Sequence, residues 1–172
     1  MPVPWILYGA MFASTFVYLV VLQVAVPPHG AVDPTIAIAL TGAGIMQAGM
    51  SLVLPRVLRA KALAALRLSL KEVEVASDSV ILRDAKTSKV VFANPDQARA
   101  RARGVGQTHW IIGWALAESV ALDGLVLGFM GGTRMQVLPL FVICWVLFLA
   151  QMPRERELFL ALEKSHEAKL EG

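Results

Sequence analysis

Two acidic residues, Glu118 and Asp123, interrupt an apolar stretch that otherwise carries no charge, residues 110–130. On a membrane-spanning helix Glu118 would lie eight residues from the start, about 12 Å deep in a hydrocarbon core of about 30 Å. A charged group at the centre costs at least about 2.5 kcal/mol, and acids kept there usually mark ion or proton pathways. We therefore predict that Glu118 binds a proton or a cation. The alternative is that a neutral Glu118 joins two helices by one hydrogen bond.

Asp123 and Gln47 complete the predicted ion-binding set. Asp123 lies about 140° around a helix from Glu118, so the two acids do not share a face, and helix packing is its favoured role. Gln47, in another apolar stretch, lies deep enough to hydrogen-bond Glu118 across a helix interface. An intramembrane enzyme would need a second catalytic group, for which only Gln47, Ser14 and Thr15 are available. No nucleophile motif, phosphate loop or metal-ligand spacing occurs, so we expect a protein without enzymatic activity, cofactor or metal.

The elements that position these residues are apolar throughout. The chain is 56% hydrophobic and 17% charged, with a mean hydropathy of +0.61, which excludes an ordinary soluble domain. Four stretches are apolar enough to cross a membrane, residues 4–26, 35–54, 110–130 and 136–152, and prolines end the first, second and fourth. The sequence predicts an all-α membrane protein, a bundle of four transmembrane helices.

The positive charges predict the orientation of this bundle. All but one of the 16 lysine and arginine residues lie between residues 55 and 109 or after residue 153, and the exception is Arg134. Because cytoplasmic loops collect Lys and Arg, we place the central segment and both termini on the cytoplasmic side of the inner membrane. In a membrane protein, surplus Lys and Arg on the cytoplasmic side normally face anionic lipid, so nucleic acid is not an expected partner.

The central segment, residues 55–109, and the tail, residues 153–172, should carry structure of their own. Residues 56–75 suggest a helix that either lies along the lipid headgroups or extends the second span. Residues 79–83 and 89–93 suggest the arms of a β-hairpin, and the tail suggests a charged helix that docks on the central segment or stays in solvent. The basic residues predicted to contact lipid or a partner are Arg56, Arg59, Arg67, Lys71, Arg99, Arg101 and Arg103.

Small residues in the second and third spans predict close helix packing. Residues such as Gly44 and Ala48, four apart, let two helix backbones approach closely. The predicted packing residues are Gly42, Gly44, Ala48, Gly49 and Gly124.

Residues 115–126 resemble the ion-binding helix of the proteolipid c subunits of rotary ATP synthases. In that family an embedded acid precedes a short apolar stretch, an aromatic residue and then Gly-Leu-Val. Glu118 matches the acid and residues 124–126 match the trailing Gly-Leu-Val, whereas Asp123 stands where the family usually has Tyr. Residues 41–44 are similar to part of the family's Gly-rich first helix. The resemblance implies that Glu118 carries a proton or Na⁺.

Two functions follow as expectations. The first is a membrane subunit that assembles with copies of itself or with other subunits and uses Glu118 to bind or relay a proton or Na⁺. The second is a structural or accessory subunit of a larger membrane complex, in which both acids only pack and the basic cytoplasmic segment binds a partner. Membrane lipids are expected partners in either case.

Overall fold

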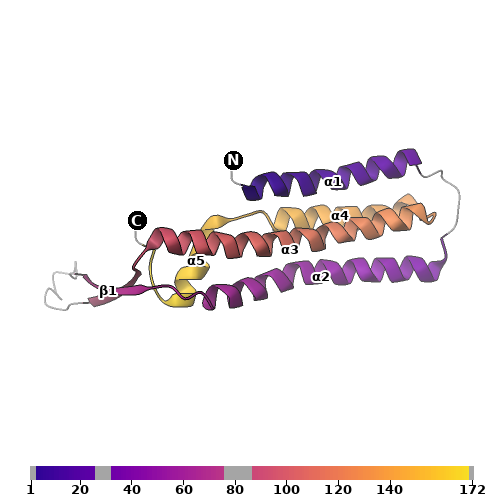
Figure 1. Ribbon diagram of the computed structural model, residues 1–172. Helices are drawn as coiled ribbons and strands as arrows, with labels where there is room; N and C mark the ends of the chain where they lie inside the picture. The colour runs from indigo at the N-terminus through magenta and orange to yellow at the C-terminus, as the bar shows by residue number, and fades with distance from the viewer. Residues whose placement is uncertain (1–2, 26–31, 76–86, 171–172) are drawn as a thin grey trace, which may run out of the picture. The chain divides into compact units, whose positions relative to one another are not determined.

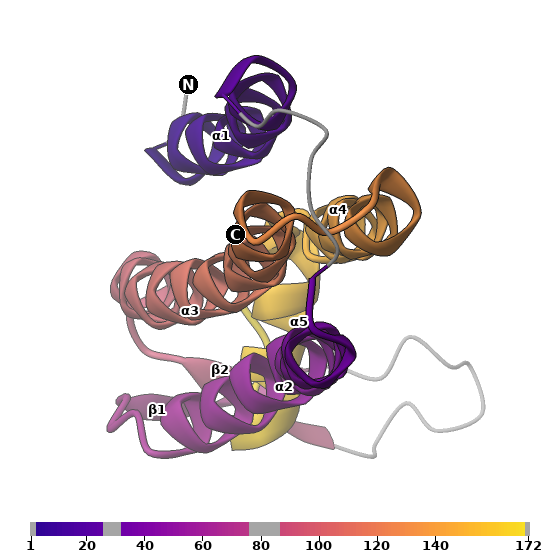
Figure 2. The same ribbon diagram turned by 90° about the vertical axis from the view of Figure 1, so that its right-hand side faces the viewer.

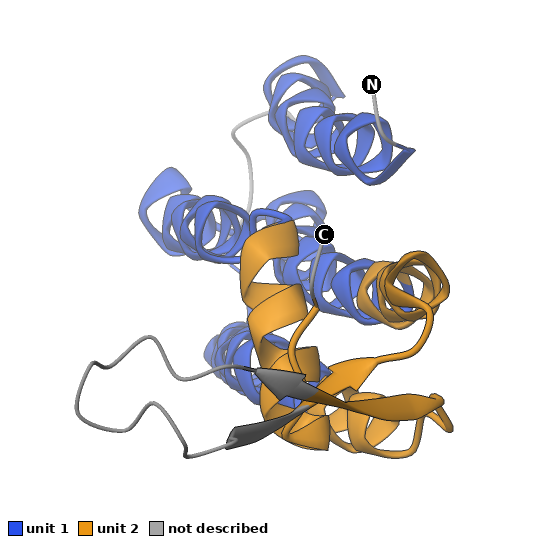
Figure 3. Cartoon of the chain, turned by 90° about the vertical axis from the view of Figure 1, so that its left-hand side faces the viewer, with its two compact units in different colours: residues 1–57, 108–153 blue, residues 58–107, 154–172 orange. Residues whose placement is uncertain are grey.

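The computed structural model describes residues 3–25, 32–75 and 87–170 (Figure 1). Within these ranges the chain forms five helices and one two-stranded sheet. The elements are α1 (Val3–Ala25), α2 (Pro34–Ala64), β1 (Leu70–Val75), β2 (Thr87–Phe92), α3 (Pro95–Phe129), α4 (Arg134–Ala150) and α5 (Glu155–His166). They belong to two compact units, shown in blue and orange in Figure 3: unit 1 is residues 1–57 and 108–153, and unit 2 is residues 58–107 and 154–172.

Three of the described helices, α1, α2 and α3, are long and apolar enough to cross a membrane. The 17-residue α4 meets the same criterion only when it is counted together with α5 as one broken span. Apolar side chains on α1 remain exposed, among them Val24 at 82%, as a surface in contact with lipid requires.

In unit 1, glycines bring three helices close together around Leu140 of α4. A Cβ atom placed on Gly44 of α2 would lie 2.9 Å from Leu140 Cδ2, and one on Gly124 of α3 would lie 3.2 Å from Leu140 Cβ. Leu140 itself is 1% exposed. The turn from α3 to α4 needs Gly131, whose φ of 93° lies in the left-handed region.

The helix α1 lies on the far side of α3 and α4 from α2 (Figure 2). Its buried residues are Tyr8 and Thr15. Aromatic rings join it to its neighbours: the ring of Tyr8 is 5.5 Å from that of Trp114, and Phe16 stacks on Trp145 at 5.0 Å. Aromatic contacts and polar bonds therefore account for much of its attachment.

The helix α2 runs through Pro55 to Ala64, which agrees with the predicted alternative that residues after Pro55 extend the helix of the second span. Proline inside a helix removes a hydrogen bond and crowds the preceding turn. Gly113 of α3 lies opposite, where an added Cβ would be 3.3 Å from Pro55 Cγ, so the lack of a side chain there makes room for the ring.

The predicted helix over residues 56–75 is wrong beyond Ala64. Leu70–Val75 forms β1, in which charged and apolar residues alternate from Glu72 on, and it pairs antiparallel with β2 from Leu70 opposite Phe92 to Val75 opposite Thr87. The second arm of the predicted hairpin overlaps β2. Its first arm, residues 79–83, lies outside the described residues.

The tail docks on the central segment within unit 2, which was one of the two predicted alternatives. Leu158 and Leu162 of α5 are fully buried, and the helix ends at Glu167, whose φ of 51° turns the chain. The Lys169 amide then donates to the Val90 carbonyl at 3.1 Å, and the Phe92 amide donates to the Lys169 carbonyl at 3.3 Å. These two bonds place Lys169 beside β2 as a parallel bridge.

Candidate functional site

The carboxyl group of Glu118 is held between α3 and α1 in unit 1. Its Oε1 atom is 2.6 Å from the Ser14 hydroxyl and 2.7 Å from the Tyr18 hydroxyl. Ser14 and Tyr18 are four residues apart on α1, which places them on one helix face. We call Glu118, Ser14 and Tyr18 the carboxyl cluster.

The Ser14 hydroxyl has two oxygen neighbours and only one hydrogen. Besides Glu118 it lies 2.6 Å from the carbonyl oxygen of Met11, which can only accept a hydrogen bond. If Ser14 donates to Met11, the short contact with Glu118 requires a hydrogen on the carboxyl group. If Ser14 donates to an ionised Glu118, no hydrogen is left between the Ser14 hydroxyl oxygen and the Met11 carbonyl oxygen.

Thr15, the next residue on α1, shows how such a hydroxyl can be satisfied. It donates to the Phe12 carbonyl at 2.7 Å and accepts from the Trp145 indole N–H at 2.9 Å. A hydroxyl in the same local position thus gives its hydrogen to the backbone and receives one from a side chain. In the carboxyl cluster the corresponding side chain is Glu118, which can donate only when it is protonated.

Gln47 contacts Ser119, the neighbour of Glu118, and not Glu118 as the sequence analysis expected. The Ser119 hydroxyl lies 2.7 Å from Gln47 Oε1 and 2.7 Å from the Leu116 carbonyl oxygen. Both contacts of the Ser119 hydroxyl can be hydrogen bonds without a protonated acid. Rotating the Gln47 amide would place its NH₂ group against Ser119, and the Ser119 hydroxyl would then donate to Leu116. The hydrogen bond joins α2 to α3.

Asp123 lies on another side of α3, over Gly44 of α2. Its Oδ2 atom is 3.6 Å from the position that a Gly44 Cβ would take. This oxygen is buried and has no hydrogen-bond partner among the described residues. The structure therefore separates Asp123 from the carboxyl cluster, in keeping with the angle between the two acids on a helix.

The predicted packing glycines fall into two groups. Gly44 and Gly124 lie where helices meet, whereas an added Cβ on Gly42 or Gly49 would meet nothing within 4 Å in the described part of the chain. Ala48 is half-buried, and its carbonyl accepts from Ser51 at 2.9 Å.

The basic residues predicted to contact lipid or a partner lie on different elements, since Arg67 follows the end of α2 and Lys71 is on β1. Arg56 and Arg59 remain on α2, the former exposed and the latter half-buried. Arg101 donates to the Arg67 carbonyl at 2.9 Å, and Arg103 pairs with Glu155 at 3.3 Å and lies 5.5 Å from the centre of the Phe159 ring. Within unit 2, Arg101 and Arg103 therefore join α3 to neighbouring segments.

Sequence reasoning missed Tyr18 and Ser119. Tyr18 could have been found from its four-residue spacing to Ser14, and Ser119 from its position beside Glu118. Among the described residues no group of three or more His, Cys, Asp or Glu side chains could hold a metal ion. No family model, curated protein or solved structure matches this chain.

Proposed function

We propose that this protein is an integral membrane subunit in which Glu118 binds and releases a proton. In this proposal α4 is a fourth span, both termini are cytoplasmic, and the subunit assembles with copies of itself or with other membrane subunits. The observation that carries the proposal is the carboxyl cluster. Two hydroxyl groups meet one carboxyl oxygen there, and one of them also touches a backbone carbonyl.

The proton is favoured over a metal ion because of the groups around Glu118. Divalent cations such as Ca²⁺ need six or more oxygen ligands, usually with several carboxylates. The carboxyl cluster supplies one acid and two hydroxyls that meet the same carboxyl oxygen, Oε1, which is too few ligands for such an ion. A monovalent cation such as Na⁺ is the rival ligand, and the test below separates the two.

The composition of unit 2 supports the proposed orientation. It brings together the central segment and the tail, the two segments that contain most of the positive charge. Both would have to lie on one side of the membrane to pack as they do, which requires an even number of spans between them. Spans formed by α3 and α4 meet that requirement.

The test is the infrared absorption of protonated carboxyl groups in the full chain, reconstituted in lipid. Glu118→Gln should remove a band that Asp123→Asn leaves in place, and Ser14→Ala should shift this band because the carboxyl loses a hydrogen-bond partner. Labelling of Glu118 by a hydrophobic carbodiimide should follow the same pattern and be insensitive to Na⁺. A spectrum that Glu118→Gln leaves unchanged would refute the proposal, and protection from labelling by Na⁺ would favour the cation.

A structural role is the second candidate, and the sparse burial of α1 favours it. In that case Glu118 only fastens α1 to α3, and a neutral amide that can still accept from Tyr18 would serve as well. Glu118→Gln would then preserve assembly and activity of the complex. Loss of proton movement in an intact Glu118→Gln complex would exclude this candidate.

A further inference from the structure

Asp123 is an acid of the apolar stretch of α3 that the proposed function does not use. It lies seven residues before Met130, about 10 Å of helix from the end of that stretch. Its side chain is half-buried, and its Oδ2 atom is buried without a hydrogen-bond partner among the described residues. Buried polar atoms in proteins are nearly always hydrogen-bonded, so an exception points to a functional group or a bound ligand.

The atoms found next to this oxygen are apolar. A Cβ placed on Gly44 of α2 would lie 3.6 Å from Asp123 Oδ2. The same position is 3.7 Å from Val120 Cγ1 and 2.9 Å from Leu140 Cδ2. Methyl groups of α3 and α4 therefore share this place with the carboxyl group, and a methyl group cannot donate a hydrogen bond to an oxygen in the way that a hydroxyl or an amide does.

The helices packed beside Asp123 supply no charge that would balance an ionised carboxylate. The apolar stretches of α2 and α4, residues 35–54 and 136–152, contain no Lys, Arg, His, Asp or Glu. The ionisable side chain within them is Cys144, which is 0% exposed, and Arg134 at the start of α4 is exposed. An unbalanced charge at this depth is costly, so the neutral, protonated carboxyl group is the favoured form of Asp123.

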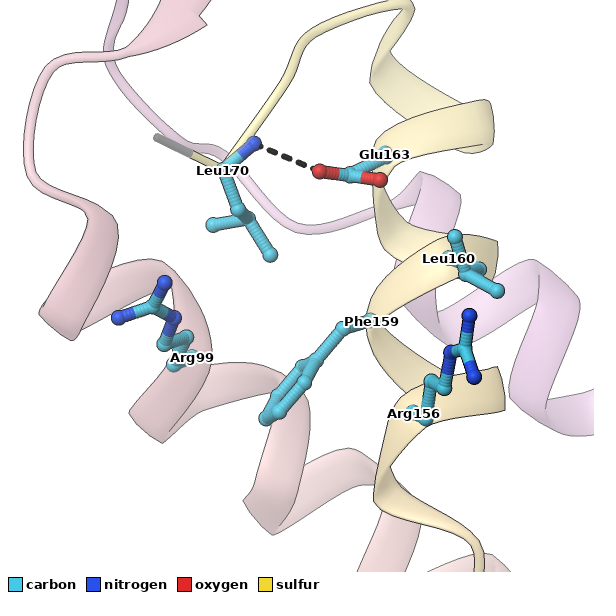
Figure 4. A pocket seen from close by; sticks show the side chains of 6 residues that line it. All are labelled: Arg99, Arg156, Phe159, Leu160, Glu163 and Leu170. Atoms are coloured by element: carbon cyan, nitrogen blue, oxygen red, sulfur yellow. Dashed lines mark hydrogen bonds between the residues drawn. The ribbon is translucent and has the colours of Figure 1, made fainter. Parts of the chain in front are cut away.

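Two acids of unit 2 show how carboxyl groups are satisfied elsewhere in this protein. Glu163 lines a groove of about 330 Å³, where its Oε1 atom accepts from the Leu170 amide at 2.8 Å (Figure 4). Asp96 pairs with Arg99, another residue of the groove lining, at 3.6 Å. Both acids therefore have a partner that carries N–H groups, whereas the described part of the chain offers none to Asp123 Oδ2.

Two alternative roles for Asp123 fit these surroundings less well. A packing role, which the sequence favours, would give it a hydrogen bond across the helix interface, as Ser119 has with Gln47 at 2.7 Å. A metal ion would need several oxygen ligands, and the methyl groups beside Oδ2 supply none. A proton needs only the carboxyl group itself.

We propose that Asp123 is a second proton-binding group of this protein, with the hydrogen on Oδ1 and the buried Oδ2 as the carbonyl oxygen. A hydrogen on Oδ2 would need an acceptor, which the methyl groups around it do not provide. Together with the proton proposed for Glu118, the protein then binds two protons on faces of α3 about 140° apart. The inference does not rest on Glu118, because the two carboxyl groups have separate surroundings.

The experiment is infrared spectroscopy of the full chain in lipid, over a range of pH. At neutral pH, Asp123→Asn should remove a carboxylic acid band that remains in Glu118→Gln. This band should lie at higher wavenumber than the Glu118 band, because Oδ2 accepts no hydrogen bond whereas two hydroxyls approach Glu118 Oε1. It should lose intensity as the pH is raised and Asp123 releases its proton.

A hydrogen-bond donor placed beside Oδ2 should shift this band. In Gly44→Ser the new Cβ would lie 3.6 Å from Oδ2, so the serine hydroxyl can reach the oxygen. The substitution is made together with Leu140→Ala, which removes the side chain that the new Cβ would otherwise meet at 2.9 Å. The Asp123 band should move to lower wavenumber in this double variant. The matched control, Gly44→Ala with Leu140→Ala, fills the same space without a hydroxyl and should leave the band in place.

The inference is overturned if Asp123→Asn removes only carboxylate absorption at neutral pH, or if the Asp123 band keeps its full intensity at every pH at which the protein stays folded. It is also overturned if the serine and alanine variants of Gly44 shift the band alike. Loss of the band on addition of Na⁺, but not of K⁺, would indicate a cation site instead of a proton site. A missing Glu118 band would refute the proposed function, and the Asp123 band would still be judged by itself.

Discussion

The packing around Leu140 gives the sharpest prediction about the stability of unit 1. In Gly44→Ala the new methyl group would start 2.9 Å from Leu140 Cδ2, whereas carbon atoms normally pack 3.5–4.0 Å apart. Leu140 is 1% exposed and also faces Gly124, so it has little room to move. Overpacking of this kind costs about 1–3 kcal/mol, and replacing glycine by alanine in a helix returns up to about 1 kcal/mol. We expect a net loss of up to about 2 kcal/mol.

Two further variants isolate the contact. Gly49→Ala, on the same helix but with nothing within 4 Å, should be neutral or more stable by up to about 1 kcal/mol. Leu140→Ala should cost about 2–5 kcal/mol because it opens a cavity. In that background Gly44→Ala should become stabilising, since its methyl group enters the vacated space. The coupling free energy between the two substitutions should be about 1–3 kcal/mol.

The assay is unfolding of the full chain in mixed micelles of increasing sodium dodecyl sulfate content, followed by the fluorescence of its four tryptophans. The free energy of unfolding is compared for the single and double variants. Equal effects of Gly44→Ala and Gly49→Ala, or strictly additive effects of Gly44→Ala and Leu140→Ala, would refute the proposed close approach of α2 to α4.

Two more predictions concern single side chains. His166 donates from Nε2 to the Leu66 carbonyl at 2.9 Å, so His166→Ala should destabilise unit 2 by about 0.5–1.5 kcal/mol. The exchange rate of the Lys169 amide hydrogen, which bonds to Val90, should rise in the variant. Equal exchange rates in the variant and the original protein would contradict this prediction. Cys144 is 0% exposed, so a maleimide should label it only after denaturation, and rapid labelling of the folded protein would show that α4 is packed differently.

The apolar helices were predictable because their signal is a long uncharged run, which needs no knowledge of neighbours. At Pro55 the helix continues to Ala64, in agreement with the alternative that the second span is extended. The helix predicted over residues 56–75 fails at Leu70–Val75, whose valines alternate with charged residues. A strand of this kind depends on pairing with its partner, which is β2 (Thr87–Phe92).

The site was predictable only in part for a similar reason. Depth along a helix identified Glu118, since depth follows from counting residues. Its partners depend on how the helices are rotated against one another, and counting does not give that rotation. Gln47, at a suitable depth, was therefore predicted as the partner of Glu118, although it bonds to Ser119 and α1 supplies Ser14 and Tyr18.

The pairing of Lys169 with β2 has a consequence for how the protein is made. Ribosomes deliver β2 early, and α4 must be synthesised before Leu158 and Leu162 of α5 can find their places in unit 2. Closing so long a loop costs little extra, because the entropy of closure grows only with the logarithm of its length. The docking of α5 therefore comes last in biogenesis.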